Sequence, residues 1–120
     1  MFGITGALPH PQLKDRIKDY PKAWAAQPSQ MISYVSCHDD HCIGDRLRIT
    51  DPEADAKQRM RLLKLAETAV LTSQGVPFIF TGDELMRDKK GVKNSYNSPD
   101  SINVIDWRLK KEHEDSYKLY

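Results

Sequence analysis

The stretch Met31-Ile32-Ser33-Tyr34-Val35-Ser36-Cys37-His38-Asp39-Asp40-His41-Cys42 decides the fold class of this 120-residue chain. Its first half has apolar residues on both alternating faces, so it predicts a strand over residues 31–36 that is buried on both sides. Its second half, the hexad 37–42, consists of side chains that ionise, ligate metals or move protons. Polar groups that follow a parallel strand lie at the C-terminal edge of the sheet, where such folds build their sites.

A long amphipathic helix and a second apolar strand follow the hexad. Asp51 is a favourable N-cap and the next residue is a proline, so the helix is predicted to begin there. Apolar side chains then recur at three- and four-residue steps: Met60, Leu62, Leu63, Leu65, Ala66, Ala69 and Val70. Gly75 is predicted to end the helix, and residues 76–80 to form a strand that ends on Asp83 and Glu84. A right-handed crossover of this kind makes the two strands parallel and adjacent.

The two ends of the chain are predicted to be largely irregular. Residues 1–30 form a Pro-rich lead-in with little periodicity, in which residues 13–20 have room for two helical turns. Residues 86–103 are polar and turn-rich, and residues 110–119 have the pattern of the beginning of another helix. The chain therefore divides into a lead-in, 1–30, and an α/β region, 31–120.

Charge and composition exclude several classes of partner. The net charge is +1, from 18 basic and 17 acidic residues, which gives no electrostatic footprint for nucleic acid or for an anionic membrane. No apolar run approaches the roughly 20 residues of a membrane span, and residues 1–7 lack the features of a signal peptide. We therefore expect no nucleic-acid partner and no membrane partner.

The cysteines and histidines of the hexad suggest two kinds of chemistry. Four of its side chains are zinc-ligand types: Cys37, His38, His41 and Cys42. Their spacing is poor for zinc, because neighbouring ligands on an extended backbone point to opposite faces, and no second ligand pair follows. A nucleophilic cysteine would need a distant histidine, and His10 and His113 are weak candidates. A Cys37–Cys42 disulfide stays open beside free thiols.

The carboxylates of the hexad suggest two further interpretations. His38 and Asp39 together suit the binding of a polyhydroxylated substrate, whereas Asp39 and Asp40 could equally do no more than cap a turn. Asp39 and Glu84 at neighbouring strand ends are a conceivable carboxylate pair for glycoside hydrolysis, which needs two carboxyl groups. The alternative for Asp83 and Glu84 is to hydrogen-bond the loop backbone nearby. The polar loop 94–100 offers amides, hydroxyls and an aromatic ring, all suited to sugars.

Three ordered motifs resemble the C-terminal part of the catalytic barrel of the α-amylase superfamily, glycoside hydrolase family 13. Tyr34-Val35-Ser36-Cys37-His38-Asp39 is similar to the family's signature region at the end of the seventh strand. Residues 71–85 are similar to the passage from helix 7 to strand 8, and residues 94–107 to the loop after strand 8. Within the superfamily, these motifs most resemble the type I pullulanase and debranching-enzyme branch, over residues 29–120.

The resemblance implies an α/β fold: a βαβ segment corresponding to strands 7 and 8 of a (β/α)8 TIM barrel. A whole barrel takes about 250 residues, so the barrel would be incomplete. It implies that residues 31–120 supply strand 7, helix 7, strand 8, a long loop and the start of helix 8. Open strand edges would then favour self-association.

The resemblance also implies a function and a site. The parent enzyme would be a retaining, pullulanase-type α-1,6-debranching hydrolase with an α-glucan substrate. No cofactor is expected for this chain, and its residues offer no evident ligand set for a metal such as calcium. Asp39 would stabilise the transition state with help from His38, and Tyr96 and Asn97 would contact the sugar. Asp40 departs from the more usual asparagine. The family's nucleophile and general acid have no counterpart here, so this chain is expected to be inactive by itself. A non-catalytic carbohydrate-binding or interaction module and a small Cys/His metal protein are the alternatives.

Overall fold

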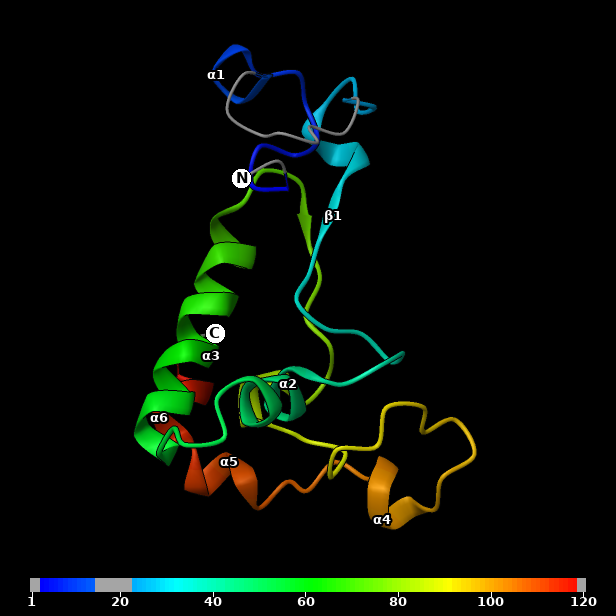
Figure 1. The fold of residues 1–120 in the computed structure, drawn as a ribbon, viewed down its shortest axis with the longest axis vertical. Coiled ribbons are helices and arrows are strands. Elements are labelled where there is room, and N and C mark those ends of the chain that lie inside the picture. Colours follow the sequence, from blue (N-terminus) through cyan, green and yellow to red (C-terminus); the bar gives the residue numbers. More distant parts are fainter. Residues whose placement is uncertain (1–2, 15–22, 119–120) are drawn as a thin grey trace. The chain divides into compact units, whose positions relative to one another are not determined.

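The structure is a computed structural model that describes residues 3–14 and 23–118, and it divides the chain into two compact units. The first, called here the strand unit, consists of Met1–Tyr34 and Glu67–Phe78. The second, the site unit, consists of Val35–Ala66 and Ile79–Tyr120. The chain therefore passes from one unit to the other three times, after Tyr34, within the long helix after Ala66, and after Phe78. Figure 1 shows the course of the chain.

The described residues form one long helix, several short helices and two short strands. The elements in chain order are α1 (Pro11–Lys14), the 3-10 turn η1 (Pro28–Gln30), β1 (Ile32–Ser33), α2 (Ile43–Thr50), α3 (Ala56–Thr72), β2 (Val76–Pro77), the 3-10 turn η2 (Asp83–Leu85), α4 (Asp100–Asn103), α5 (Leu109–Glu112) and α6 (Glu114–Tyr117). Most of the helical segment predicted at 13–20 lies outside the described residues. No helix in the described parts of the chain is both long and apolar enough to cross a bilayer.

The strand unit is built on a parallel pair of strands, which confirms the predicted pairing. β1 and β2 lie side by side, with Ile32 opposite Val76 and Ser33 opposite Pro77 (Figure 1). Val76 N donates to the carbonyl of Met31 at 2.8 Å, so the ladder extends one residue before β1. The crossover between the strands contains two helices, α2 and α3, rather than the single predicted one.

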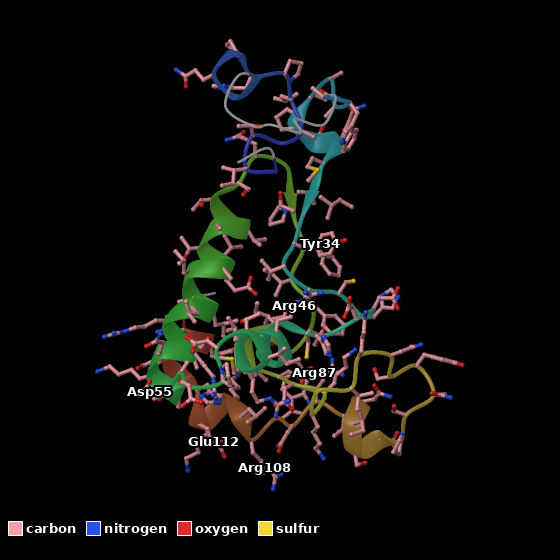
Figure 2. The ribbon with its side chains drawn as sticks, viewed as in Figure 1. Tyr34, Arg46, Asp55, Arg87, Arg108 and Glu112 are labelled. Atoms are coloured by element: carbon pink, nitrogen blue, oxygen red, sulfur yellow. The ribbon has the colours of Figure 1, made fainter. Side chains whose placement is uncertain are left out.

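The strands are shorter and more exposed than predicted. Burial on both faces was expected from the apolar pattern, but Ile32, Tyr34, Val76 and Phe78 are 55%, 55%, 48% and 41% exposed. The rings of Tyr34 and Phe78 contact each other edge to face, with centroids 6.0 Å apart (Figure 2). Because the described sheet has only two strands, it has two free edges, and a pattern suited to burial on both faces stays partly in solvent.

The long helix begins later than predicted. α3 starts at Ala56, and Asp55 is the capping residue, because its Oδ1 accepts the N–H of Gln58 at 2.7 Å. Asp51 instead ends α2, and its N–H donates to the carbonyl of Leu47. Both aspartates are good caps by type, and the unpredicted helix α2 takes the first of them.

The apolar stripe of α3 is narrower than the periodicity indicates. Leu63 and Val70 are buried, whereas Leu65 is 67% exposed. The helix predicted over 110–119 is divided into α5 and α6, because His113 has a non-helical backbone conformation. Periodicity therefore predicted these helices, but not their limits.

Gly75 permits the strands to meet after α3. Its φ is +117°, and a Cβ built there would lie 2.7 Å from the carbonyl oxygen of Met31, which pairs with β2. Only glycine fits both the backbone conformation and the close approach.

We expect Gly75→Ala to destabilise the strand pair by about 1–3 kcal/mol, through backbone strain and displacement of Met31. Amide hydrogen exchange of Val76 and Phe78, whose N–H groups donate to the carbonyls of Met31 and Ser33, measures this directly. Gly3→Ala is the control, because its nearest contact would lie at 3.9 Å. Unchanged protection of both amides in Gly75→Ala would contradict the argument.

Candidate functional site

A cavity of about 230 Å³ in the site unit brings together residues from the hexad and the polar loop. Three of the four predicted site residues line it: His38, Asp39 and Tyr96. Asn97 is exposed and is not among the lining residues. The other lining residues are Phe80, Arg87, Lys89, Lys93, Asn94, Ser95 and Asn103.

Asp39 is the one carboxylate among these lining residues, and its side chain is free to accept hydrogen bonds. His38 and Asp39 are both exposed, and neither side chain hydrogen-bonds another described residue. An ionised carboxylate accepts hydrogen bonds only, so it is suited to hydroxyl donors of a ligand. The pair therefore faces an open polar cavity with its acceptor capacity unused.

Asp40, by contrast, caps the turn. Its backbone is left-handed, with φ +62°, and its Oδ1 accepts the N–H of His41 at 2.9 Å. Arg46 lies 3.4 Å from its other oxygen (Figure 2). The hydrogen bond from His41, and then the charges of Lys93 and Arg46, lower the pKa of this carboxyl. Both aspartate and asparagine tolerate a left-handed backbone, so the departure from asparagine preserves the turn.

The two segments that follow the strands are joined by a buried hydrogen bond between Ser36 and Asp83. Ser36 Oγ donates to Asp83 Oδ2 at 2.5 Å, and both residues are buried. Asp83 Oδ1 has no partner among the described residues. Burial raises the pKa of Asp83 to about 6, assisted by the nearby charge of Glu84 and opposed by the hydrogen bond from Ser36. Asp83 is thus a buried structural carboxyl and is not part of the cavity lining.

Glu84 supports the loop that it belongs to, as the second interpretation of this residue predicted. Its Oε2 accepts the N–H of Gly82 at 2.9 Å. Gly82 has φ +99°, and a Cβ there would lie 2.7 Å from the side chain of Arg87. Glycine is therefore required at this turn, and Glu84 stabilises it.

Arg87 and Asn103 hold the polar loop in place. Arg87 is buried, donates to the carbonyls of Thr81 and Asn103 at 3.3 and 2.6 Å, and lies over the Phe80 ring, 5.1 Å from its centroid (Figure 2). Asn103 Nδ2 donates to the carbonyls of Ser95 and Ser98. These bonds leave Tyr96 at the loop tip, 84% exposed.

A second buried carboxylate, Asp45, organises the other wall. It accepts from Cys42 Sγ at 3.0 Å, from Arg48 at 3.0 Å, and from the backbone N–H groups of Lys89 and Gly91 at 2.8 and 2.6 Å. Burial by itself raises the pKa of Asp45, but the donated hydrogen bonds, that of Cys42 first, and the charge of Arg48 outweigh it and keep the pKa below its ordinary value. Asp45 is therefore ionised and fully buried.

The thiol of Cys42 is a structural donor. Burial, and then its hydrogen bond to Asp45, raise its pKa to about 12. Cys37 and Cys42 are both free, so no disulfide joins them. A zinc ligand and a nucleophile both need a thiolate, which Cys42 does not supply near neutral pH. Within the described ranges, no three His, Cys, Asp or Glu side chains lie close enough together to hold a metal ion.

Sequence reasoning missed the basic side chains of the cavity. Lys89, the largest fully buried side chain, belongs to a Lys-Lys pair that resembles a solvated surface turn. Arg87 lies in the same polar stretch and is also buried. The burial of Arg87 and Lys89 goes with carbonyls and carboxylates that lie near a buried strand end. That grouping is visible only in the three-dimensional structure, so the sequence does not reveal it.

The comparisons place the homologues of this chain in one class, the pullulanases. A pullulanase of Bacillus subtilis is 44% identical over 81 residues, which cover 68% of this chain and 11% of the relative. The chloroplastic pullulanase 1 of Arabidopsis thaliana is 39% identical over 88 residues, covering 72% of this chain and 9% of the relative. This chain thus spans about a tenth of the length of these curated relatives. No protein-family model matches it.

Solved structures that are similar to this fold are also pullulanases. The structure of a pullulanase from Paenibacillus barengoltzii, in complex with maltohexaose and α-cyclodextrin, matches 98% of this chain with a TM-score of 0.83 and 36% sequence identity. The match covers 17% of that protein. The fold of this chain is therefore similar to a short region of that pullulanase structure.

The raised pKa of Asp83 predicts a pH dependence of stability. The native carboxyl keeps its proton up to about pH 6, whereas the unfolded chain releases it near 3.8, so the contribution of Asp83 to stability is fully present below about pH 4 and is lost as the pH rises through 6. Asp83→Asn should remove this slope and raise stability at pH 7.5 by up to ~3 kcal/mol.

Thermal unfolding between pH 4 and 8 measures the effect, with Asp115→Asn, an exposed aspartate, as the control. Lower stability of Asp83→Asn than of the wild type at pH 7.5 would contradict the destabilising ionisation of the buried Asp83.

Proposed function

We propose that this chain is the segment of a pullulanase-type glycoside hydrolase that carries strands 7 and 8 of a (β/α)8 barrel. β1 would be strand 7, α3 helix 7 and β2 strand 8, within a partial barrel domain of residues 31–120 that follows a lead-in of residues 1–30. Support comes from the parallel pairing of β1 with β2 and from the likeness to pullulanases. The parent enzyme would hydrolyse α-1,6 linkages of α-glucans with retention of configuration.

The cavity of the site unit would bind the glucan. The observation that carries this proposal is that His38, Asp39 and Tyr96, from two distant segments, line one cavity in which the Asp39 carboxylate has no partner among the described residues. Asp39 would accept hydrogen bonds from sugar hydroxyls and stabilise positive charge in the transition state, and His38 would assist it. Tyr96 would stack on a sugar ring, and Asn97 would make a contact at the rim.

Sugar binding by this chain is the first test. Calorimetry should detect maltohexaose binding, and Asp39→Ala should weaken it more than tenfold, because a hydrogen bond to a charged group is worth about 1.5–3 kcal/mol. Asp115→Ala removes an exposed carboxylate that is not in the cavity lining and serves as the control. Equal affinities of wild type and Asp39→Ala would reject the assigned role of Asp39.

The chain should bind without cleaving. A retaining glycosidase needs two carboxyl groups across the scissile bond, and the described lining of the cavity holds one, Asp39. We therefore expect no release of reducing ends from pullulan by the purified chain. Release that Asp39→Ala abolishes would contradict this expectation. The single carboxylate also fits the alternative of a carbohydrate-binding module without catalysis, and binding with no cleavage favours that alternative for the chain by itself.

The chain is also proposed to self-associate through its strands. The bonds that join β1 and β2 come from Met31, Ser33, Val76 and Phe78, so the Ile32 backbone faces the free edge of β1. Pro77 lacks an N–H and blocks the free edge of β2. The β1 edge is therefore the one suited to pairing.

Sedimentation of Ile32→Lys should give a smaller average mass than the wild type, because a charge is placed on the pairing edge. Ile49→Lys changes an equally exposed isoleucine on α2 and should leave the mass unchanged; Ile32 is 55% and Ile49 53% exposed. A wild-type chain that sediments as a monomer at every concentration would end this proposal.

A further inference from the structure

We infer that Lys89 is a positioning residue that holds the backbone on both sides of Asp39 and so fixes the Asp39 carboxylate in the cavity. Lys89 Nζ donates to the carbonyl of His38 at 3.4 Å and to the carbonyl of Asp40. Asp39 is the residue between these two carbonyls. The inference deepens the proposed sugar site and rests on it.

Lys89 makes these two contacts from a buried position, which distinguishes it from a lysine on the surface. Lys89 is only 1% exposed, and its ammonium makes no ion pair with a described carboxylate. A buried ammonium is costly unless polar groups replace its hydration, so the two carbonyls are its principal compensation. Burial of this lysine lowers the stability of the fold. Such a cost is expected where the buried residue sets the geometry of a site.

The contacts of Lys89 Nζ with the carbonyls of His38 and Asp40, called here the clamp, are fixed at both ends by further hydrogen bonds. The Lys89 backbone N–H donates to the buried carboxylate of Asp45, which also holds Gly91. At the other end, the left-handed turn at Asp40 is closed by the N–H of His41. Lys89 therefore links a rigid anchor to the turn that carries Asp39.

The chemistry of lysine suits this role. An ammonium is a compact donor on a flexible stem and reaches two carbonyls that face different directions, whereas the planar guanidinium of arginine has a fixed fork. Two of its three donors are used by His38 and Asp40, and Lys89 also lines the cavity. Loss of the ammonium would leave two carbonyls without their donor and release the turn.

NMR on the isotope-labelled chain tests the clamp without any sugar. The Lys89 Nζ protons of the wild type should exchange with water more slowly than those of Lys90, which is exposed. In Lys89→Met, the carbonyl carbons of His38 and Asp40 should both shift upfield, while Lys90→Met should leave them unchanged. Equally fast exchange of the two lysines would overturn the inference, and this measurement on the wild type decides even if Lys89→Met fails to fold.

Sugar binding tests the consequence for Asp39. Lys89→Met should weaken maltohexaose binding about tenfold, the loss expected when one charge-assisted contact is misplaced, and Lys90→Met should not. Wild-type affinity in a folded Lys89→Met would overturn the positioning role. A wild type that shows the slow Nζ exchange and yet binds no maltohexaose would reject the proposed function, while the clamp on the Asp39 turn would stand.

Discussion

The buried carboxylate of Asp45 is the group on which the site unit depends. It is fully buried and ionised, and it gathers a thiol, a guanidinium and two backbone N–H groups from segments more than forty residues apart in sequence. A buried charge without partners would strongly destabilise the folded state, so the carboxylate needs these four donors together. Asp45 thereby brings the start of α2 and the segment after η2 to one place.

The geometry of the cavity follows from this constraint. With residues 89–91 held on Asp45, the long side chain of Lys89 reaches the hexad, and Arg87 reaches the carbonyls beside the polar loop. The cavity lining thus combines cationic and amide side chains of the segments after β2 with His38 and Asp39 of the hexad. In the proposed function, this single carboxylate among several donors would hold a neutral polyhydroxylated ligand in one orientation.

Sequence periodicity and residue type predicted the parts of the fold that depend on local physics. The parallel strands, the long helix and the requirement for glycine at position 75 follow from apolar patterns and backbone preference. The start of α3 was misassigned because Asp51 and Asp55 are equally good caps, and only the presence of α2 decides between them. Burial of the strands was overestimated, because burial depends on neighbours that a pattern does not specify.

Part of the candidate site, like part of the fold, could be predicted from the sequence. A His-Asp pair directly after a strand and an aromatic residue in a polar loop identified His38, Asp39 and Tyr96, all of which line the cavity. The separation of Asp39 from Asp40, one free and one capping, depends on a left-handed backbone that the sequence permits but does not require. Lys89 was hidden because a lysine in a charged, turn-rich stretch is ordinarily solvated, and its burial arises from long-range packing.

The different environments of the two cysteines have a practical consequence. Cys42 is buried and its thiol resists ionisation, with a pKa of about 12, whereas Cys37 is partly exposed and lies two residues before Asp39. Alkylating reagents act on the thiolate, so they discriminate strongly between the two positions. The native chain therefore carries a single reactive attachment point for a fluorophore or spin label, next in sequence to the cavity-lining His38, and occupancy could be followed there without introducing any new residue.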